Sequence, residues 1–310
     1  MQKRSGPEIA VVGAGAVGCY FGAMLARAGM PVTLIGRAGH VEAIRQNGLR
    51  FQSGTLDERV KVAATTDIAA VSGARLVLFC VKSLDTDAAA EAMAPHLAPE
   101  ATILSLQNGV DNIERIRAKT NNAVIPVLVY AAANMPEPGT VRHTGGGNVV
   151  IGPGRADIAA LFAAANVPVK VSDDIDAELW TKLVMNCAYN AVCALTGTPY
   201  GEMVAMPEIR AVMIETVDEV VALAKAKGIR LPDDMADAAI RLAEVMPQTM
   251  SSTAQDIAKG RRTEIDHLNG YVAREGARLG VATPATTTLH ALMKLLEAKR
   301  SRPAQPGPNN

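Results

Sequence analysis

The sequence lacks several features that would indicate particular classes of protein. Its four cysteines, Cys19, Cys80, Cys187 and Cys193, form no CxxC pair, and all of them stand in apolar segments. This pattern is typical of thiols that stay reduced and buried, and not of a disulfide-stabilised secreted domain. None of the five histidines belongs to an HExxH motif or to a Cys/His cluster, so we expect no metal site.

An excess of charge and long apolar runs are also missing. The chain has 31 basic and 31 acidic residues, so no overall field points to nucleic acid or to an anionic membrane as a partner. The apolar run at residues 9–12 is interrupted by Gly13 and Gly15, and no segment is long enough to span a bilayer. We therefore expect a cytoplasmic protein, with a disordered tail rich in Pro, Gln and Asn at residues 301–310.

The first candidate site is a glycine turn near the start of the chain. An apolar strand at residues 8–12 is followed by GAGAVG and by a helix to about residue 28, which is the context of a dinucleotide-binding fingerprint. Gly13 would permit the tight turn, Gly15 the approach of the pyrophosphate, and Gly18 the packing of helix on strand. A merely structural tight turn is the alternative. Free N–H groups at the helix start would hold the phosphates, so the expected cofactor-binding residues are Gly13, Ala14, Gly15, Ala16, Val17 and Gly18.

The residue after the second strand favours NADP over NAD. The strand at residues 31–36 (PVTLIG) ends where an NAD enzyme would place Asp or Glu on the ribose hydroxyl, and Arg37 stands there instead. A cation at this point accommodates a 2′-phosphate, which an acid would repel. The alternative is an ordinary exposed loop arginine. NADPH/NADP+ is therefore the predicted cofactor.

Two further polar positions follow apolar strands. The run LVLFCV at residues 76–81 ends in Lys82, at the edge of a parallel sheet where ligands bind. The strand TILSL at residues 102–106 precedes Gln107, Asn108 and Gly109. The amide of Asn108 could reach the nicotinamide end of a cofactor laid across the strand ends, although Asn-Gly is also a common turn.

The pattern changes from strands to helices after residue 172. Residues 124–130, 139–143 and 148–152 predict strands that resemble a hairpin, and a last strand at 167–171 leads into the helix-start signal Ser-Asp-Asp at 172–174. Helices are predicted at 207–227, 232–245, 251–259, 263–279 and 284–299. We therefore predict an α/β fold, with a Rossmann-type dinucleotide-binding domain at residues 1–172 and an all-helical domain at 173–300.

A polar stripe marks the helix predicted at residues 177–195. Lys182, Asn186 and Asn190 recur every four residues, so they share one face of a helix that is otherwise apolar. Each buried polar group costs about 1–3 kcal/mol unless it is hydrogen-bonded. A solvated surface face is the alternative, but the rest of the circumference is apolar. The stripe therefore predicts a cleft, between the two domains, that is filled by a polar ligand.

The motifs together resemble those of one enzyme family. GAGAVG at 13–18, VKSLDT at 81–86, QNG at 107–109, LWTKLVMNCAYNAVCAL at 179–195 and SSTAQDIAKGRRTEID at 251–266 are similar to the motifs of the ketopantoate reductases. These enzymes are NADPH-dependent 2-dehydropantoate 2-reductases of pantothenate and coenzyme A biosynthesis. The similarity extends over nearly the whole chain, and the motifs of the helical half are more specific than the glycine turn.

The resemblance implies roles for individual residues. Lys182 matches the general acid that protonates the ketone oxygen as hydride arrives from C4 of the nicotinamide, and Glu264 matches the residue that binds the substrate hydroxyl. Asn108 matches a residue that positions this lysine and the nicotinamide. The remaining matched positions are implied to bind the substrate's polar groups (Asn186, Asn190 and Ser252, with Asn108) or the adenosine phosphate (Arg37 and Lys82).

Two departures from the family pattern bear on the substrate. Tyr200 stands where the family often has Asn, and Thr253 replaces the Met that is common after the serine pair. The first change removes or alters a contact to the substrate, so a related 2-oxo acid is an alternative substrate. A non-catalytic NADP-binding sensor is a further alternative, although it would not need the polar set of the helical half. A homodimer is possible, and the sequence leaves the oligomeric state open.

Overall fold

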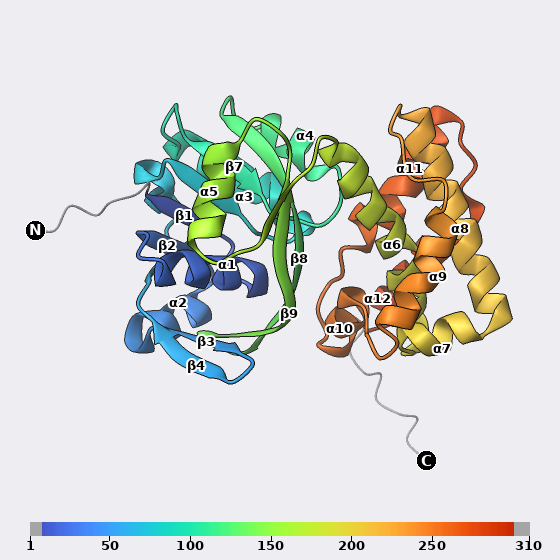
Figure 1. The fold of residues 1–310 in the computed structure, drawn as a ribbon, viewed down its shortest axis with the longest axis horizontal. Coiled ribbons are helices and arrows are strands. Elements are labelled where there is room, and N and C mark those ends of the chain that lie inside the picture. Colours follow the sequence, from blue (N-terminus) through green and yellow to red (C-terminus); the bar gives the residue numbers. More distant parts are fainter. Residues whose placement is uncertain (1–7, 301–310) are drawn as a thin grey trace, which may run out of the picture. The chain divides into compact units, whose positions relative to one another are not determined.

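The computed structural model describes residues 8–300 of the chain. The described residues form two compact units, one up to Glu178 and one from Leu179 onward (Figure 1). The boundary between the units falls inside helix α6 (Ile175–Thr196). The disordered tail predicted at 301–310 lies outside the described residues.

The first unit is built on a ten-stranded sheet in the order β4-β3-β9-β8-β7-β6-β1-β2-β5, with β10 beside β9. From β5 to β8 all neighbouring strands are parallel, whereas the pairs β8–β9 and β3–β4 are antiparallel. The central strands are apolar throughout because helices cover both faces of a parallel sheet. The strands are β1 (Ile9–Val12), β2 (Val32–Ile35), β3 (Leu49–Ser53), β4 (Leu56–Val60), β5 (Ala63–Thr65), β6 (Leu76–Phe79), β7 (Thr102–Ser105), β8 (Ala123–Glu137), β9 (Thr140–Ile151) and β10 (Val169–Val171).

Helices cover both faces of this sheet, and the alternation along β1 shows which helix lies on which face. Ile9 and Val11 pack into a core with α1 and α5, whereas Ala10 and Val12 point to the opposite face and pack with α3 and α4. The helices of this unit are α1 (Ala16–Arg27), α2 (Ala38–Asn47), α3 (Thr86–Met93), α4 (Asn112–Arg117) and α5 (Ala156–Ala164), with short 3₁₀ turns η1 (Ile68–Gly73), η2 (Ser83–Asp85) and η3 (Ala94–His96).

The hairpin predicted after the fourth parallel strand is longer and simpler than expected. The strands predicted at 139–143 and 148–152 are one strand, β9, which pairs with β8 along its length. The pairing shifts in register near the glycines at 145–147, so the strand continues through them. The β3–β4 hairpin and the short edge strand β5 were not predicted. The missed signal in β3 is the alternation of the buried Leu49 and Phe51 with the polar Arg50, which pairs with Asp57 across the hairpin.

The second unit is helical throughout its described residues, as predicted. Its helices are the continuation of α6, then α7 (Tyr200–Ala205), α8 (Pro207–Ala226), α9 (Met235–Val245), α10 (Ser252–Ala258), α11 (Asn269–Leu279) and α12 (Pro284–Arg300), with the 3₁₀ turn η4 (Ile265–His267). The single helix predicted at 263–279 is wrong, because the chain forms η4 first and turns at Leu268 before α11 begins. Helix α7 was not predicted.

The predicted start and stop signals are present at several helix ends. The carboxylate of Asp174 accepts a hydrogen bond of 2.9 Å from the N–H of Ala177 in the first turn of α6. Pro207 and Pro284 are the first residues of α8 and α12, where a missing N–H costs nothing. Gly280 ends α11 in the left-handed conformation at φ 70°.

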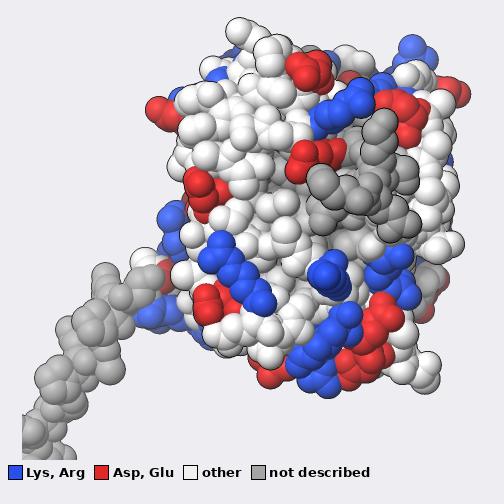
Figure 2. Space-filling model, turned by 90° about the vertical axis from the view of Figure 1, so that its left-hand side faces the viewer, with Lys and Arg blue, Asp and Glu red and all other residues white. Residues whose placement is uncertain are grey.

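The surface agrees with the balanced charge of the sequence. Acidic and basic side chains are interspersed on the face that Figure 2 shows. Among residues 8–300, no helix combines the length and the apolar character that crossing a bilayer requires.

Candidate active site

The glycine turn between β1 and α1 has the geometry that its sequence predicted. Gly13 adopts φ +106°, and a Cβ built on it would lie 2.6 Å from the backbone nitrogen of Val81, so only glycine fits. Gly18 is equally constrained, because its Cβ would lie 2.2 Å from the carbonyl oxygen of Gly13. Gly15 differs from both, since no atom lies within 4 Å of its added Cβ. The space above Gly15 is thus open to a ligand.

The start of α1 suits an anion. The helix has no acidic residue in its first turn, and no side chain caps it. The N–H groups of Ala16, Val17 and Gly18 have no carbonyl one turn earlier within the helix, so they point outward with the positive end of the helix dipole. A pyrophosphate therefore fits this turn by both its shape and its charge.

The neighbouring strand ends are tied directly to the glycine turn. The N–H groups of Gly13 and Ala14 both donate to the carbonyl of Ile35 at the end of β2, at 2.9 and 3.0 Å. Arg37 follows as the residue before α2, with its side chain 89% exposed and 3.4 Å from the carboxylate of Asp85 in η2. The guanidinium is therefore positioned by an exposed and weak ion pair and is accessible to a phosphate.

Lys82 and Asn108 lie on adjacent loops of the same sheet edge. Lys82 follows β6 and immediately precedes η2. The backbone carbonyl of Asn108 accepts hydrogen bonds from the Ser83 hydroxyl at 3.0 Å and from the Asn112 amide at 2.7 Å. The structure therefore brings together the unit-one positions that the sequence predicted: the glycine turn, Arg37, Lys82 and Asn108.

A buried polar network supports these loops, and sequence reasoning missed it. The side-chain amide of Gln107 donates to the carbonyl of Val81 at 3.0 Å and to the hydroxyl of Thr86 at 2.7 Å. Thr86 in turn donates to Asn112 at 2.9 Å, and Ser105 donates to Gln107 at 3.0 Å. Such satisfied networks make a loop rigid. The sequence signal was the polar pair Ser105 and Gln107 at the end of an otherwise apolar strand.

In the second unit, Lys182 and Glu264 interact electrostatically. Lys182 is half-buried on α6, while Trp180, Leu183 and Val184 beside it are fully packed. Burial lowers the pKa of Lys182 to about 8, and the negative charge of Glu264 opposes this shift. Glu264 is also half-buried and immediately precedes η4. The pair places a proton donor of moderate acidity next to a carboxylate.

The other polar positions of this unit differ in depth. Asn186 is half-buried one turn after Lys182, whereas Asn190 is only 2% exposed. The carbonyl of Asn190 accepts a hydrogen bond of 3.4 Å from the Ser251 hydroxyl, which also caps α10 by accepting from the N–H of Ala254 at 3.0 Å. Ser252 is exposed as the first residue of α10. The serine pair thus divides into a structural cap, Ser251, and an exposed hydroxyl, Ser252.

Tyr200, the departure from the family pattern, lies in the core of the second unit. Its ring is 9% exposed and lies 4.2 Å, between centroids, from the ring of Tyr189 on α6. Tyr189 also donates a hydrogen bond from its hydroxyl to the carbonyl of Ala239 on α9. Burial raises the pKa of Tyr200, which therefore stays neutral. Its ring thus packs beside α6, the helix that carries Lys182.

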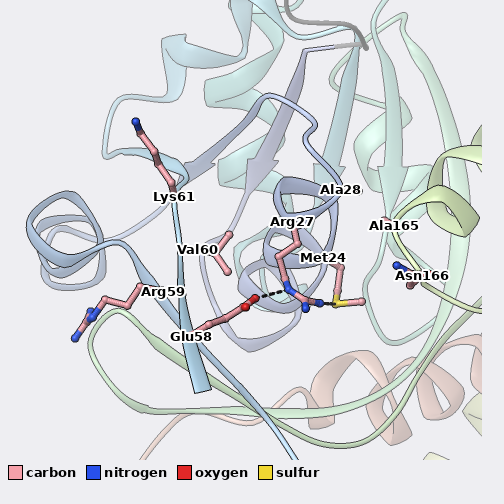
Figure 3. Close-up of a pocket in the computed structure, with 9 residues that line it drawn as sticks. All are labelled: Met24, Arg27, Ala28, Glu58, Arg59, Val60, Lys61, Ala165 and Asn166. Atoms are coloured by element: carbon pink, nitrogen blue, oxygen red, sulfur yellow. Dashed lines mark hydrogen bonds and ion pairs between the residues drawn. The ribbon is translucent and has the colours of Figure 1, made fainter. Parts of the chain in front are cut away.

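A hollow of about 400 Å³ lies elsewhere in the first unit, at the opposite end of α1 (Figure 3). The Arg27 guanidinium there bonds to the carboxylate of Glu58 and lies 3.6 Å from the sulfur of Met24. Arg59 and Lys61 also line the hollow, but their side chains point away from this guanidinium (Figure 3). The C-terminal end of a helix repels anions. This end of α1 therefore favours a phosphate less than its N-terminal end does.

The parallel sheet, its glycine turn and the helical unit that follows define a Rossmann-type α/β protein with a helical C-terminal part. The chain belongs to the ketopantoate reductase PanE/ApbA family. The family model "Ketopantoate reductase PanE/ApbA" matches residues 9–156, and "Ketopantoate reductase PanE/ApbA C terminal" matches residues 174–297.

Individual relatives match over nearly their whole length. The structure is similar to that of a PanE/ApbA family ketopantoate reductase from Ralstonia eutropha, with a TM-score of 0.92, 52% identity and coverage of 95% of this chain and 100% of that chain. The 2-dehydropantoate 2-reductase of Halobacterium salinarum is 33% identical, over 94% of this chain and 99% of its own. D-mandelate dehydrogenase, solved with NADH and anilino(oxo)acetate, shares the fold at 24% identity, with a TM-score of 0.86 over 95% of this chain and 100% of its own.

Proposed function

We propose that this protein is an NADPH-dependent reductase that converts 2-dehydropantoate to (R)-pantoate, in pantothenate and coenzyme A biosynthesis. When bound, the nicotinamide supplies a hydride from C4 to the ketone carbon of the substrate. The chain's own residues bind both molecules and supply the proton that the ketone oxygen takes up. The relatives of the same family that carry the name 2-dehydropantoate 2-reductase support this substrate.

The observation that carries the proposal is Lys182 itself, a half-buried cation on the otherwise packed helix α6 that interacts with the carboxylate of Glu264. Hydride addition builds negative charge on the ketone oxygen, and a cationic donor aimed at that oxygen stabilises it. With a pKa of about 8, Lys182 is charged at neutral pH, yet it is a much stronger acid than an ordinary lysine. It therefore can hold a proton beside the oxygen and release it during the reaction.

The remaining polar residues of the second unit are proposed to hold the substrate. Glu264 would accept a hydrogen bond from the substrate hydroxyl while its charge keeps Lys182 protonated. Asn186, half-buried one turn from Lys182, and the exposed hydroxyl of Ser252 would bind further polar groups of the substrate. Asn190 is proposed for the same set, at the deepest position on the helix face.

The first unit is proposed to hold NADPH. The glycine turn would bind the pyrophosphate, while Arg37 and Lys82 would bind the adenosine phosphate. Asn108, with its backbone fixed by Ser83 and Asn112, would orient the nicotinamide and contact the substrate. The proposed cofactor-binding residues thus lie in the first predicted domain, 1–172. The proposed substrate-binding residues other than Asn108 lie in the second, 173–300.

The test is the substitution Lys182→Ala. Loss of a general acid lowers kcat about 10²- to 10⁴-fold, while the dissociation constant of NADPH should stay close to the wild-type value. Lys225→Ala, which removes an exposed lysine from α8, is the matched control and should leave both quantities unchanged. Near-normal turnover of 2-dehydropantoate by Lys182→Ala would refute the role of this lysine as proton donor.

Another 2-oxo acid is the second candidate substrate, and Tyr200 is the observation that favours it. The tyrosine ring is much larger than the amide that the family often has at this position, and it packs against Tyr189 on the helix that carries Lys182. The fold by itself also suits other 2-oxo acids and NADH, since D-mandelate dehydrogenase shares it.

A panel of 2-oxo acids distinguishes these possibilities. Initial rates of NADPH and NADH oxidation should be compared for 2-dehydropantoate, 2-oxoisovalerate and phenylglyoxylate, in the wild type and in Tyr200→Asn. We expect the highest kcat/KM for 2-dehydropantoate with NADPH. The second candidate would be established if the wild type had a higher kcat/KM for another acid and Tyr200→Asn changed the preference toward 2-dehydropantoate. Tight NADPH binding without oxidation by any acid would indicate a sensor.

A further inference from the structure

The segment that carries Glu264 has little regular structure of its own. Residues 259–264 connect α10 to η4 without a helix, and η4 is a single 3₁₀ turn. A side chain on such a segment points in one direction only if the flanking residues are fixed. Glu264 nevertheless lies close enough to Lys182 to raise its pKa. Contacts outside the segment must therefore hold it in place.

The first contact lies one residue before Glu264. The backbone N–H and the hydroxyl of Thr263 both donate to the same carboxylate oxygen of Glu297 on α12, each at 2.8 Å. Thr263 is 1% exposed, and the Glu297 side chain is 16% exposed. Hydrogen bonds to a shielded carboxylate are stronger than those between neutral groups.

The second contact lies two residues after Glu264. One carboxylate oxygen of Asp266 is 2.8 Å from Nε2 of His290, and the other is 2.7 Å from Nζ of Lys294, both on α12. Lys294 also lies 3.4 Å from the carboxylate of Glu297, so this ion pair links the two contacts. The hydrogen bonds from Lys294 and His290 lower the pKa of Asp266 despite its partial burial, so this carboxylate stays charged at neutral pH.

Helix α12 is itself fixed against the rest of the second unit. The carboxylate of Glu219, on α8, accepts hydrogen bonds from the N–H groups of Ala285 and Thr286 in the first turn of α12, at 2.7 and 2.8 Å. Glu219 is only 7% exposed. A negative charge on a helix N-terminus is favourable, so this contact locks the start of α12. The helix can therefore serve as a rigid support.

We propose that Asp266, His290, Lys294 and Glu297 are positioning residues that fix the direction of the Glu264 carboxylate toward Lys182. The inference rests on the proposed function only in so far as Glu264 and Lys182 act on a substrate. Thr263 and Asp266 hold the chain on both sides of Glu264, at three residues' separation. Each is bound to the same face of α12, where residues 290, 294 and 297 lie on successive turns of the helix.

The first experiment needs no substrate. The pKa of Lys182 is measured by NMR of protein labelled with [ε-¹³C]lysine, in which the Lys182 signal is identified by its absence in Lys182→Arg. Glu264→Gln lowers this pKa, because the carboxylate raises it in the wild type. Lys294→Met should lower it as well, because the released segment lets Glu264 turn away. Removing a cation without moving Glu264 would act in the opposite direction and raise the pKa of Lys182.

Two further variants protect the test against simple unfolding. Glu297→Gln weakens the other contact and should lower the pKa of Lys182 in the same direction. Lys227→Met is the matched control, because it breaks an ion pair of the same length, 2.7 Å, with Glu275 in the same unit. It should lower the thermal stability about as much as Lys294→Met does, but leave the pKa of Lys182 unchanged. An unchanged or raised pKa of Lys182 in folded Lys294→Met and Glu297→Gln overturns the proposal.

The second experiment measures catalysis. Lys294→Met should raise KM for 2-dehydropantoate about tenfold, which corresponds to about 1.4 kcal/mol. In a Glu264→Gln background the same substitution should change KM by less than a factor of about two, because the two residues act through one carboxylate. A full tenfold effect in both backgrounds would show an independent role and contradict the proposal. A wild type that reduces no 2-oxo acid refutes the proposed function alone, since the NMR result is independent of turnover.

Discussion

At the scale of single residues, Lys182 shows how the apolar surroundings of one helix change the acidity of the amine that we propose as proton donor. Burial disfavours the charged amine and lowers its pKa to about 8, and Glu264 recovers part of the loss. Because the pKa in the folded state lies below the ordinary value of 10.5, the charged lysine lowers the free energy of unfolding at neutral pH. This cost disappears as the pH rises through about 8 to 10.5. Burial of Lys182 therefore lowers the stability of the fold at neutral pH and gives the amine the acidity that the proposed reduction needs.

The pH dependence of reduction follows from this pKa. In the proposed reaction the charged form of Lys182 donates the proton, so kcat/KM for the 2-oxo acid should be constant below pH of about 8 and fall about tenfold for each further pH unit. Glu264→Gln should shift this decrease to lower pH, because the lost negative charge no longer raises the pKa of Lys182. The check is a profile of kcat/KM from pH 6 to about 10. A decrease at the same pH in both proteins would assign the titration to another group.

At the scale of elements, the glycines in the turn between β1 and α1 are present for two different physical reasons. Gly13 and Gly18 are required by the fold, because a Cβ at either position would collide with backbone atoms. Gly15 adopts φ −91°, which any residue can adopt, and has free space around it. The fold does not need glycine at position 15, so we attribute this glycine to the pyrophosphate that we propose for the turn.

Gly15→Ala should therefore affect binding but not folding. We expect a change of less than about 0.5 kcal/mol in the free energy of unfolding, together with a rise of about tenfold or more in the NADPH dissociation constant, or about 1.4 kcal/mol. Calorimetry gives both quantities. Gly145→Ala, in β9, is the control, because its added Cβ also meets no atom within 4 Å and lies far from the turn in sequence. Unchanged NADPH affinity in Gly15→Ala would exclude the pyrophosphate from this position.

The elements also show which features the sequence could predict. The glycine turn, the central parallel strands and several helix starts were predictable because each depends on neighbours within a few residues. The break of the predicted 263–279 helix was not, because it depends on Glu297 and His290 of α12, which lie more than twenty residues away from Thr263 and Asp266. The polar stripe on α6 could be read from the spacing of its residues, but the burial of Asn190 and the bond from Ser251 to its carbonyl depend on packing between helices.

At the scale of the whole molecule, the two units divide the proposed work. The first offers an open turn, a helix N-terminus and an exposed arginine, which together suit the phosphates of a dinucleotide. The second offers a lysine and a carboxylate held by a rigid helix. The balanced charge of the chain means that these local groups, and not an overall field, must select the ligands.

Selection of NADPH over NADH should therefore be visible in the thermal stability of the full chain. A ligand at 100 times its dissociation constant raises the free energy of unfolding by about 2.7 kcal/mol. At equal concentrations, NADPH should raise the melting temperature of the wild type more than NADH does, because Arg37 can bind the 2′-phosphate. Arg37→Asp should abolish the additional gain with NADPH and leave the gain with NADH nearly unchanged. A carboxylate at this position, beside Asp85, would repel the phosphate.

The control for this substitution is Arg45→Asp, which makes the same change of charge two turns further along α2, where Arg45 bonds to the carbonyl of Ala64 at 2.8 Å. It should leave the difference between NADPH and NADH intact. Differential scanning fluorimetry, with both cofactors over a range of concentrations, measures all the required shifts. Equal losses with NADPH and NADH in Arg37→Asp would mean that Arg37 does not contact the 2′-phosphate. In that case the preference must come from Lys82, the other cation at the same sheet edge, and Lys82→Ala should then remove it.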